Sequence, residues 1–404
     1  MVKHAIRFML LFSWIFLPLY PGEKTLSLEE AIARALTHSP DIITAQKELE
    51  AVRGKRIEIG ALPDPGFVFS REGLQAAPEK GEQEITFGVE QLIEFPGKKA
   101  LRRQAAASEE EILSAELQSL KLVVTAEVKK AFFKAVHSQT VVTRIEELQE
   151  VLKQYQEMAV IRFQAGQVSS LDVLRGRLES LRVRGELIEA RRKLREDLAS
   201  LTLILGEESD GLFSVAGDLS FNPLEKDLST LRAEAEARPS LRAASFRVEQ
   251  ARSSLLLAQK SALPDFTVGL YYPSLRTSSW GFSVGASIPL WRDRRKGQVL
   301  QAEAAIEAAA AGLEARRRKV LTLLEAAYAD VRAAEERLAL FEKSLLREVE
   351  SMLELGISQY RHGQIDSLNM LDVYKFYKTT KLEYLGALLA HKIVLADLEA
   401  AGER

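Results

Sequence analysis

The sequence Ala-Leu-Pro-Asp stands at residues 61–64 and again at residues 262–265, 201 positions later. A second pattern, Gly-Gln-x-x-Ser-Leu, stands at residues 166–171 and again at 363–368, 197 positions later. Repetition in the same order and at nearly the same distance indicates that the chain contains one module twice. The period of about 200 residues is too long for a solenoid repeat, so we interpret it as a duplicated module of domain size.

Long helices are predicted in both halves of the chain. Proline is absent from residues 97–222 and 290–404, which are rich in the strongest helix formers. Gly166 and Gly363 interrupt these stretches where a left-handed residue ends a helix, so each stretch becomes a helical hairpin. The first helix alone would be about 100 Å long. We place the helical hairpins at about 97–205 in the first half (23–222) and about 297–400 in the second half (223–404).

The residues before each helical hairpin alternate between apolar and small or polar side chains, which is typical of β-strands. The alternation predicts one β-hairpin over about 65–93 and another over about 265–289. Phe282 and Val284 on one face and Ser283 on the other suit lipid outside and water inside a barrel. Because four strands cannot close a membrane barrel, several chains have to share one. The alternative is a soluble four-stranded sheet packed on helices.

The N-terminus resembles an export signal. Lys3 and Arg7 precede an apolar run over residues 8–19, which the breakers Pro21 and Gly22 follow. This order is typical of a secretory signal peptide, which we place at residues 1–22 without a defined cleavage site. A buried N-terminal helix is the alternative.

The overall composition excludes several classes of protein. With 55 Lys and Arg against 57 Asp and Glu, the net charge is −2, and nothing indicates a nucleic-acid partner. The absence of cysteine excludes disulfides, thiolate catalysis and zinc knuckles. The five histidines lack the spacing of a metal site, and no phosphate-binding loop occurs. We therefore expect no enzymatic activity, no cofactor and no bound metal.

The repeated motifs resemble those of the TolC family of outer-membrane efflux proteins. The resemblance rests on the two Leu-Pro-Asp motifs, on Phe-Pro-Gly-Lys at residues 95–98 and on the two glycine turns. It extends from about residue 26 to the C-terminus. The combination of Leu-Pro-Asp-Pro at 62–65 with Phe-Pro-Gly-Lys at 95–98 is most similar to the cobalt-zinc-cadmium and copper/silver branch. The resemblance implies a fold that is mainly α with membrane β, in which a homotrimer shares one twelve-stranded β-barrel, continued by a periplasmic α-helical barrel. It also implies two partners, a periplasmic adaptor and an inner-membrane pump of the resistance-nodulation-division type.

The same resemblance assigns a periplasmic constriction to residues that follow the two glycine turns. Acidic residues at these places line the constriction in the family, and a ring of carboxylates from three chains would favour cations. The matching residues are Asp172, Asn369 and Asp372, and Asn369 stands where the family commonly has Asp. Exposed helix caps are the alternative interpretation.

The turns themselves are candidates for docking the adaptor, because the fold would present them at the far end of the helical barrel. These residues are Gly166, Gln167, Ser170, Gly363, Gln364 and Ser367. Ordinary helix breakers and caps would have the same composition.

Basic residues cluster after each β-hairpin, although positive charge is unfavourable at a helix N-terminus. Lipid phosphates at the membrane boundary would attract them, with aromatic side chains beside them as anchors. The predicted anchors are Phe95, Trp291, Lys98, Lys99, Arg292 and Arg294. A solvated face is the alternative.

These features together predict an outer-membrane channel that acts as a passive exit duct of a tripartite efflux system. The outer channel of type I protein secretion and a periplasmic coiled-coil scaffold without a pore stay open as alternatives. The cargo cannot be read from the sequence, since no metal relay of Met, His and Cys is visible.

Overall fold

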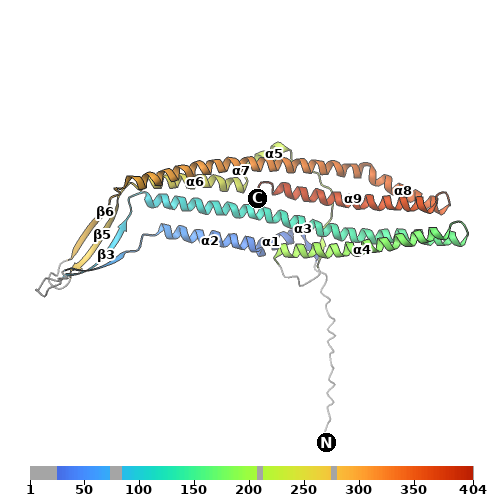
Figure 1. The fold of residues 1–404 in the computed structure, drawn as a ribbon, viewed down its shortest axis with the longest axis horizontal. Helices are drawn as coiled ribbons and strands as arrows, with labels where there is room; N and C mark the ends of the chain where they lie inside the picture. Colours follow the sequence, from blue (N-terminus) through green and yellow to red (C-terminus); the bar gives the residue numbers. More distant parts are fainter. Residues whose placement is uncertain (1–24, 73–83, 207–212, 274–279, 404) are drawn as a thin grey trace, which may run out of the picture.

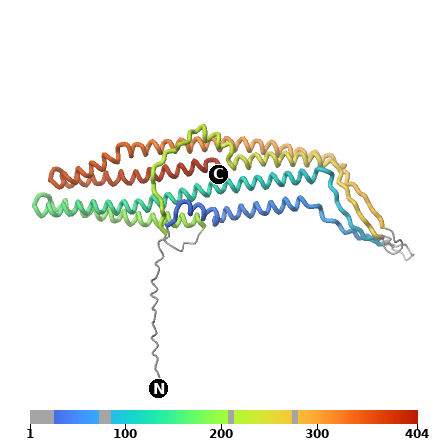
Figure 2. Tube along the Cα trace, turned by 180° about the vertical axis from the view of Figure 1, so that it is seen from behind, coloured from blue at the N-terminus to red at the C-terminus, as the bar shows by residue number. Residues whose placement is uncertain are grey.

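A computed structural model describes residues 25–72, 84–206, 213–273 and 280–403. The predicted signal peptide lies outside the described residues. The molecule is a long rod in which helices run nearly side by side and a small sheet extends from one end (Figure 1). The two helical turns lie at the opposite end of the rod, so sheet and turns are separated by the full length of the helices (Figure 2).

The first half begins with short elements and ends in two long helices. Its elements are β1 (Thr25–Ser27), α1 (Leu28–His38), α2 (Pro40–Gly60), β2 (Gly66–Glu72), β3 (Glu84–Ile93), α3 (Lys98–Gln164) and α4 (Ser170–Leu205). Both α1 and α2 begin as the sequence favours, because Ser27 caps α1 with a reciprocal Glu30 bond and Pro40 occupies the first turn of α2.

The second half has the same order of long elements. Its elements are β4 (Ser214–Ala216), α5 (Leu228–Ala235), α6 (Pro239–Lys260), β5 (Asp265–Pro273), β6 (Gly281–Ser287), α7 (Arg292–Leu340), the π-helical segment η1 (Phe341–Leu345), α8 (Leu346–Arg361) and α9 (Ser367–Glu399).

The second long helix differs from the prediction at its start. It begins at Arg292 and not at Gly297, because residues 292–296 are charged residues that tolerate a helix well. A Cβ added to Gly297 would have no neighbouring atom within 4 Å, so this glycine is accommodated inside the helix. The basic residues after the second β-hairpin therefore belong to the first turns of α7.

The sheet at the end of the rod is antiparallel, in the order β2-β3-β5-β6. Its strands contain 7 to 10 residues within the described part, and the two edge strands, β2 and β6, are the shortest. Phe69 pairs with Phe87, and Leu270 pairs with Phe282, so apolar side chains of neighbouring strands share one face. That face is uncovered, since Phe67 is 70% and Phe282 is 82% exposed. The alternative interpretation, a soluble four-stranded sheet packed on helices, is therefore wrong.

Helix α3 forms the centre of the rod. It packs against α2 and α4 on one side and against α6 and α9 on the other, while α7 and α8 lie beyond α6 and α9 (Figures 1 and 2). The core is divided along the rod into three apolar clusters. The cluster around Phe132 and Leu201 lies at mid-height, that around Tyr155 and Tyr360 lies near the turns, and a third surrounds Leu324. Among the described helices, none is long and apolar enough to cross a membrane.

Candidate functional site

The two helical turns have the same backbone structure. Gly166 and Gly363 have positive φ values of 70° and 77°, and each is followed by a residue whose N–H donates back into the preceding helix. Gln167 donates to the carbonyl of Arg162 and Gln364 to that of Gln359, both at 2.9 Å. Bonds of this kind define a Schellman cap, in which glycine is favoured because a left-handed residue with a side chain is strained. The exposed turn residues are Gly166, Gln167, Ser170, Gly363 and Gln364.

The side chains around the turns tie the two helical hairpins together. Arg162 at the end of α3 donates a 2.8 Å hydrogen bond to the carbonyl of Tyr360 in α8, and its guanidinium lies 4.7 Å from the centre of the Tyr360 ring. The rings of Tyr155 and Tyr360 are 5.1 Å apart and both are buried. No signal in the sequence predicts these contacts, since aromatic residues on long helices usually serve as core.

The position of Ser367 differs from the prediction that this residue belongs to the docking surface. The sequence places it on an exposed docking turn, but it is only 1% exposed and its hydroxyl is 3.2 Å from that of Tyr360. Its counterpart in the first half, Ser170, is exposed. The difference arises because the Ser367 hydroxyl faces the buried Tyr360, while Ser170 lies at an uncovered edge of the rod.

Asp172 closes a capping box at the start of α4. Its carboxylate accepts from the N–H and the hydroxyl of Ser169 at 3.0 and 2.9 Å, and Arg175 lies 3.6 Å away. Partial burial raises the pKa of Asp172, but hydrogen bonds from Ser169 and Ser367 outweigh burial, so that its pKa lies below the ordinary value. In the single chain this carboxylate is therefore ionised and engaged as a cap.

Asn369 and Asp372 lie together in a groove between α8 and α9. The groove has a volume of about 650 Å³ and apolar walls that include Leu355 and Phe376. The N–H of Asn369 donates to the capping carboxylate of Asp366 at 2.8 Å, while both Asn369 and Asp372 are exposed. The structure thus brings Asn369 and Asp372 together, and Asp172 lies on the other hairpin.

The first junction between sheet and helix, residues 94–98, is closed by the repeated Leu-Pro-Asp motif of the second half. Asp265 accepts from the Phe95 N–H at 2.8 Å and from the Lys98 ammonium at 2.9 Å, and Lys98 also donates to the Leu263 carbonyl at 2.8 Å. Lys98 is only 8% exposed. This finding corrects the prediction that Lys98 anchors the chain to lipid, because its charge is neutralised inside the chain.

The second junction, residues 288–292, is uncovered. Trp291 is 80% exposed, and Arg292 and Arg294 are also exposed. Within the described residues, neither arginine has an ion pair. The two junctions therefore differ in burial, although both follow a β-hairpin and both start a long helix.

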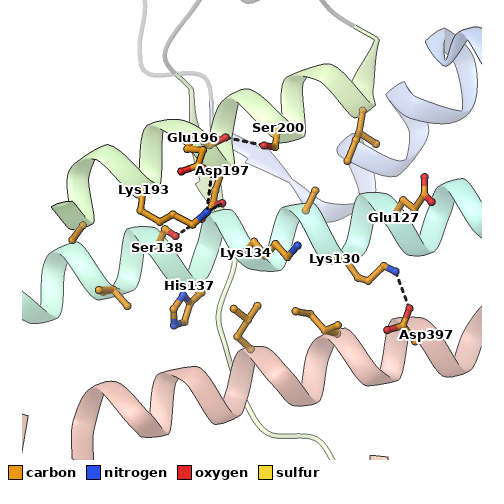
Figure 3. A pocket seen from close by; sticks show the side chains of 16 residues that line it. Glu127, Lys130, Lys134, His137, Ser138, Lys193, Glu196, Asp197, Ser200 and Asp397 are labelled. Atoms are coloured by element: carbon orange, nitrogen blue, oxygen red, sulfur yellow. Dashed lines mark hydrogen bonds and ion pairs between the residues drawn. The ribbon is translucent and has the colours of Figure 1, made fainter. Parts of the chain in front are cut away.

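A further groove, of about 770 Å³, lies on α3 between α4 and α9 (Figure 3). Asp197 of α4 is buried there, accepting from Ser138 at 2.5 Å and pairing with Lys193 at 3.1 Å. Burial lowers the pKa of His137, and the nearby Asp197 carboxylate opposes that shift. Most of the charged residues of 191–197 are exposed, whereas Asp197 is buried. In the part of the chain that the structure describes, no group of acidic or histidine residues suits a metal ion.

An uncovered apolar sheet at one end of a helical rod is typical of one class of protein, the outer-membrane proteins whose helices extend away from the bilayer. The chain belongs to the outer membrane efflux protein family, whose sequence profile matches residues 31–207 and 231–402. The resemblance to the TolC family is thereby confirmed, the protein is an efflux channel of the outer membrane, and its helical part lies in the periplasm.

Individual relatives agree with this assignment. The chain is 24% identical over 375 residues to the cobalt-zinc-cadmium resistance protein CzcC of Cupriavidus metallidurans, covering 92% of this chain and 89% of CzcC. The fold is similar to that of VceC from Vibrio cholerae, with a TM-score of 0.75, 19% identity and coverage of 93% and 96% of the two chains. It is also similar to the open state of the MtrE channel of Neisseria gonorrhoeae, with a TM-score of 0.77, 18% identity and coverage of 93% and 88%.

Proposed function

We propose that this chain is the outer-membrane duct of a tripartite efflux system, receiving its cargo from an inner-membrane pump of the resistance-nodulation-division type through a periplasmic adaptor. The observation that carries the proposal is that two different surfaces lie at opposite ends of the rod. An apolar-faced sheet lies at one end, exposed helical turns lie at the other, and α3 with 67 residues joins them over about 100 Å.

Three copies form the proposed channel. Four strands leave β2 and β6 as unpaired edges, and unpaired backbone groups in hydrocarbon cost several kcal/mol each. A homotrimer with a twelve-stranded barrel removes all edges. The mass of the detergent-solubilised protein tests this point, since a single-chain mass would support the scaffold alternative and contradict a pore.

Asp172, Asn369 and Asp372 form the proposed periplasmic constriction. Asp372 and Asn369 are exposed beside the turns, and Asp172 is held ionised by its cap. Single-channel recording of the Asp172→Ala, Asp372→Ala double variant tests the role, and Asp41→Ala, on α2 far from the turns, is the matched control. We expect higher conductance and weaker cation preference only in the double variant, and unchanged values would contradict the assignment.

The exposed turn residues Gly166, Gln167, Ser170, Gly363 and Gln364 form the proposed adaptor surface, from which buried Ser367 is omitted. Gln167→Trp and Gln364→Trp should abolish cross-linking to the adaptor while trimers persist. Replacing the glutamines avoids the backbone strain that any side chain at the positive-φ glycines causes. Full cross-linking in both variants would exclude these turns.

Phe95, Trp291, Lys99, Arg292 and Arg294 mark the proposed membrane boundary, where aromatic and basic residues favour the interface. Tryptophan fluorescence of a Trp280→Phe variant, with a quencher placed at different depths in the lipid, measures the position of Trp291. Quenching only from the aqueous phase would contradict the anchor.

Metal ions are the proposed cargo, supported by the similarity to CzcC, which is named for cobalt, zinc and cadmium resistance. A deletion strain should become sensitive to these divalent metals, and the wild-type gene should restore growth. Sensitivity to organic drugs or to monovalent copper and silver alone would redirect the assignment. Loss of a secreted protein, with normal metal tolerance, would favour type I secretion.

A further inference from the structure

The first junction is a complete binding arrangement for an aspartate. The Asp265 side chain bridges the N–H of Phe95, ahead of α3, and the ammonium of Lys98, the first residue of α3. The carboxylate comes from the second half of the chain and the helix start from the first half. The contact forms because β3 and β5 are neighbours in the sheet.

The second junction, residues 288–292, offers an N–H and a cation without a carboxylate of its own, and Asp293 follows it in the first turn of α7. Pro289 follows Ile288 as Pro96 follows Phe95, so the Ile288 N–H corresponds to that of Phe95. Arg292 is the first residue of α7, as Lys98 is the first residue of α3, although Arg292 stands three residues after Pro289 and Lys98 stands two residues after Pro96. Residues 288–292 are all exposed.

The matching carboxylate, that of Asp64, is present in the same chain but cannot reach the second junction. Asp64 occupies in the first Leu-Pro-Asp motif the place that Asp265 has in the second motif. Asp64 is exposed, and it has no ion pair within the described part of the chain. It lies just before β2, while the second junction follows β6, and these strands are the opposite edges of the sheet.

We propose that Asp64 of one copy closes the second junction of the next copy, accepting from the Ile288 N–H and pairing with Arg292. Strand β2 of the first copy then lies beside β6 of the second, as β5 lies beside β3 within one chain. The Asp64 of each copy binds to the second junction of one neighbour, and the second junction of each copy binds the Asp64 of the other neighbour. The contact is therefore head-to-tail and closes into a ring. This inference rests on the proposed trimer and assigns its contact residues. It gives Arg292 a carboxylate partner in place of the lipid phosphate that the proposed anchor set would give it.

The repeat also specifies the register between the copies. Paired residues of an antiparallel sheet lie on the same face, so exposed apolar residues of β2 have to face those of β6. Transferring the pairing of Ile93 with Phe266 to the equivalent residues, Ala286 and Pro65, satisfies this condition. It places Phe69 opposite Phe282, Phe67 opposite Val284 and Val68 opposite Ser283.

A charge exchange tests the ion pair. Asp64→Arg and Arg292→Asp should each speed dissociation of the detergent-solubilised trimer at least about tenfold, because one charge is left facing a like charge. The double variant should recover most of the wild-type stability. Arg294→Asp, combined with Asp64→Arg, is the matched control and should give no recovery.

Two outcomes would overturn the ion pair. If trimers of both single variants dissociate as slowly as wild-type trimers, the contact between Asp64 and Arg292 is excluded. If Arg292→Asp destabilises the trimer and Asp64→Arg does not restore its stability, Arg292 binds another group, such as a lipid phosphate.

Disulfide formation tests the register, since the chain contains no cysteine of its own. Val68→Cys with Ser283→Cys should join neighbouring copies into a covalent trimer under oxidation, because directly opposed Cα atoms lie within about 6 Å. Val68→Cys with Val284→Cys places the thiols on opposite faces and is the control. Trimers that form without this cross-link would overturn the register, whereas a single-chain mass would overturn the proposed trimer itself.

Discussion

The two helical turns and the two sheet-to-helix junctions differ in how far the halves of the chain remain alike. At the turns, the backbones match, since Gly166 and Gly363 have φ values of 70° and 77° and the same cap bonds follow. At the junctions, the first is closed by Asp265 and the second is exposed. Local hydrogen bonds within six residues repeat with the sequence, whereas contacts between elements depend on which strand is the neighbour.

The largest effect is expected where the comparison is strongest, at the first junction. Asp265→Ala removes the acceptor of the Phe95 N–H and leaves the buried Lys98 charge without its carboxylate, at a cost of about 2 kcal/mol in local stability. Hydrogen exchange of the Phe95 amide measures it and should become faster.

The matched control is Asp64→Ala, which removes the equivalent side chain of the first motif. It should leave exchange at Phe95 unchanged, because Asp64 has no ion pair or hydrogen bond with the described residues of the first junction. Equal exchange in the two variants would contradict the difference between the junctions.

A smaller effect is expected from leucine at the first position of each returning helix. Ser367→Leu inserts a large side chain at a site that is 1% exposed and should cost about 1–2 kcal/mol. Ser170→Leu, at the exposed counterpart, should change the free energy of unfolding by no more than about 0.5 kcal/mol. Thermal unfolding followed by helical circular dichroism compares them, and equal losses would mean that the turns have equivalent surroundings.

The smallest effect concerns pH at the first turn. The pKa of Asp172 is lowered in the folded chain below its ordinary value of 3.8, so its capping bonds stabilise the fold fully above that value. Stability is lost as the pH falls through the folded pKa, by about 0.5–1 kcal/mol for a cap. Thermal unfolding between pH 7 and 2 should show this loss in the wild type, below pH 3.8, and less of it in Asp172→Asn. A loss already complete at pH 5 would contradict the lowered pKa.

The helices, the strands and the glycine turns could be predicted from the sequence because each depends on neighbours in the chain. The start of α7 could not, because Gly297 resembles a helix boundary, although an exposed helix tolerates glycine at a cost of about 1 kcal/mol. The exposure of Asn369 and Asp372 was decided by the packing of α9, since the residues between them, Met370 and Leu371, are buried. The contacts of Arg162 with Tyr360 are beyond sequence reasoning, since they join residues 198 positions apart.

The sequence by itself determined proline-free helices, an amphipathic hairpin and a left-handed glycine turn in each half of the chain, because all of these depend on backbone preferences within a few residues. Tertiary structure alone decided that Asp265 is bound while Asp64 has no ion pair among the described residues, and that Ser367 is buried and Ser170 is exposed. The physical reason is position in the sheet and the rod. Strands β3 and β5 meet inside the sheet, whereas the edge strands β2 and β6 have no further strand partner on their outer sides within the described part of the chain.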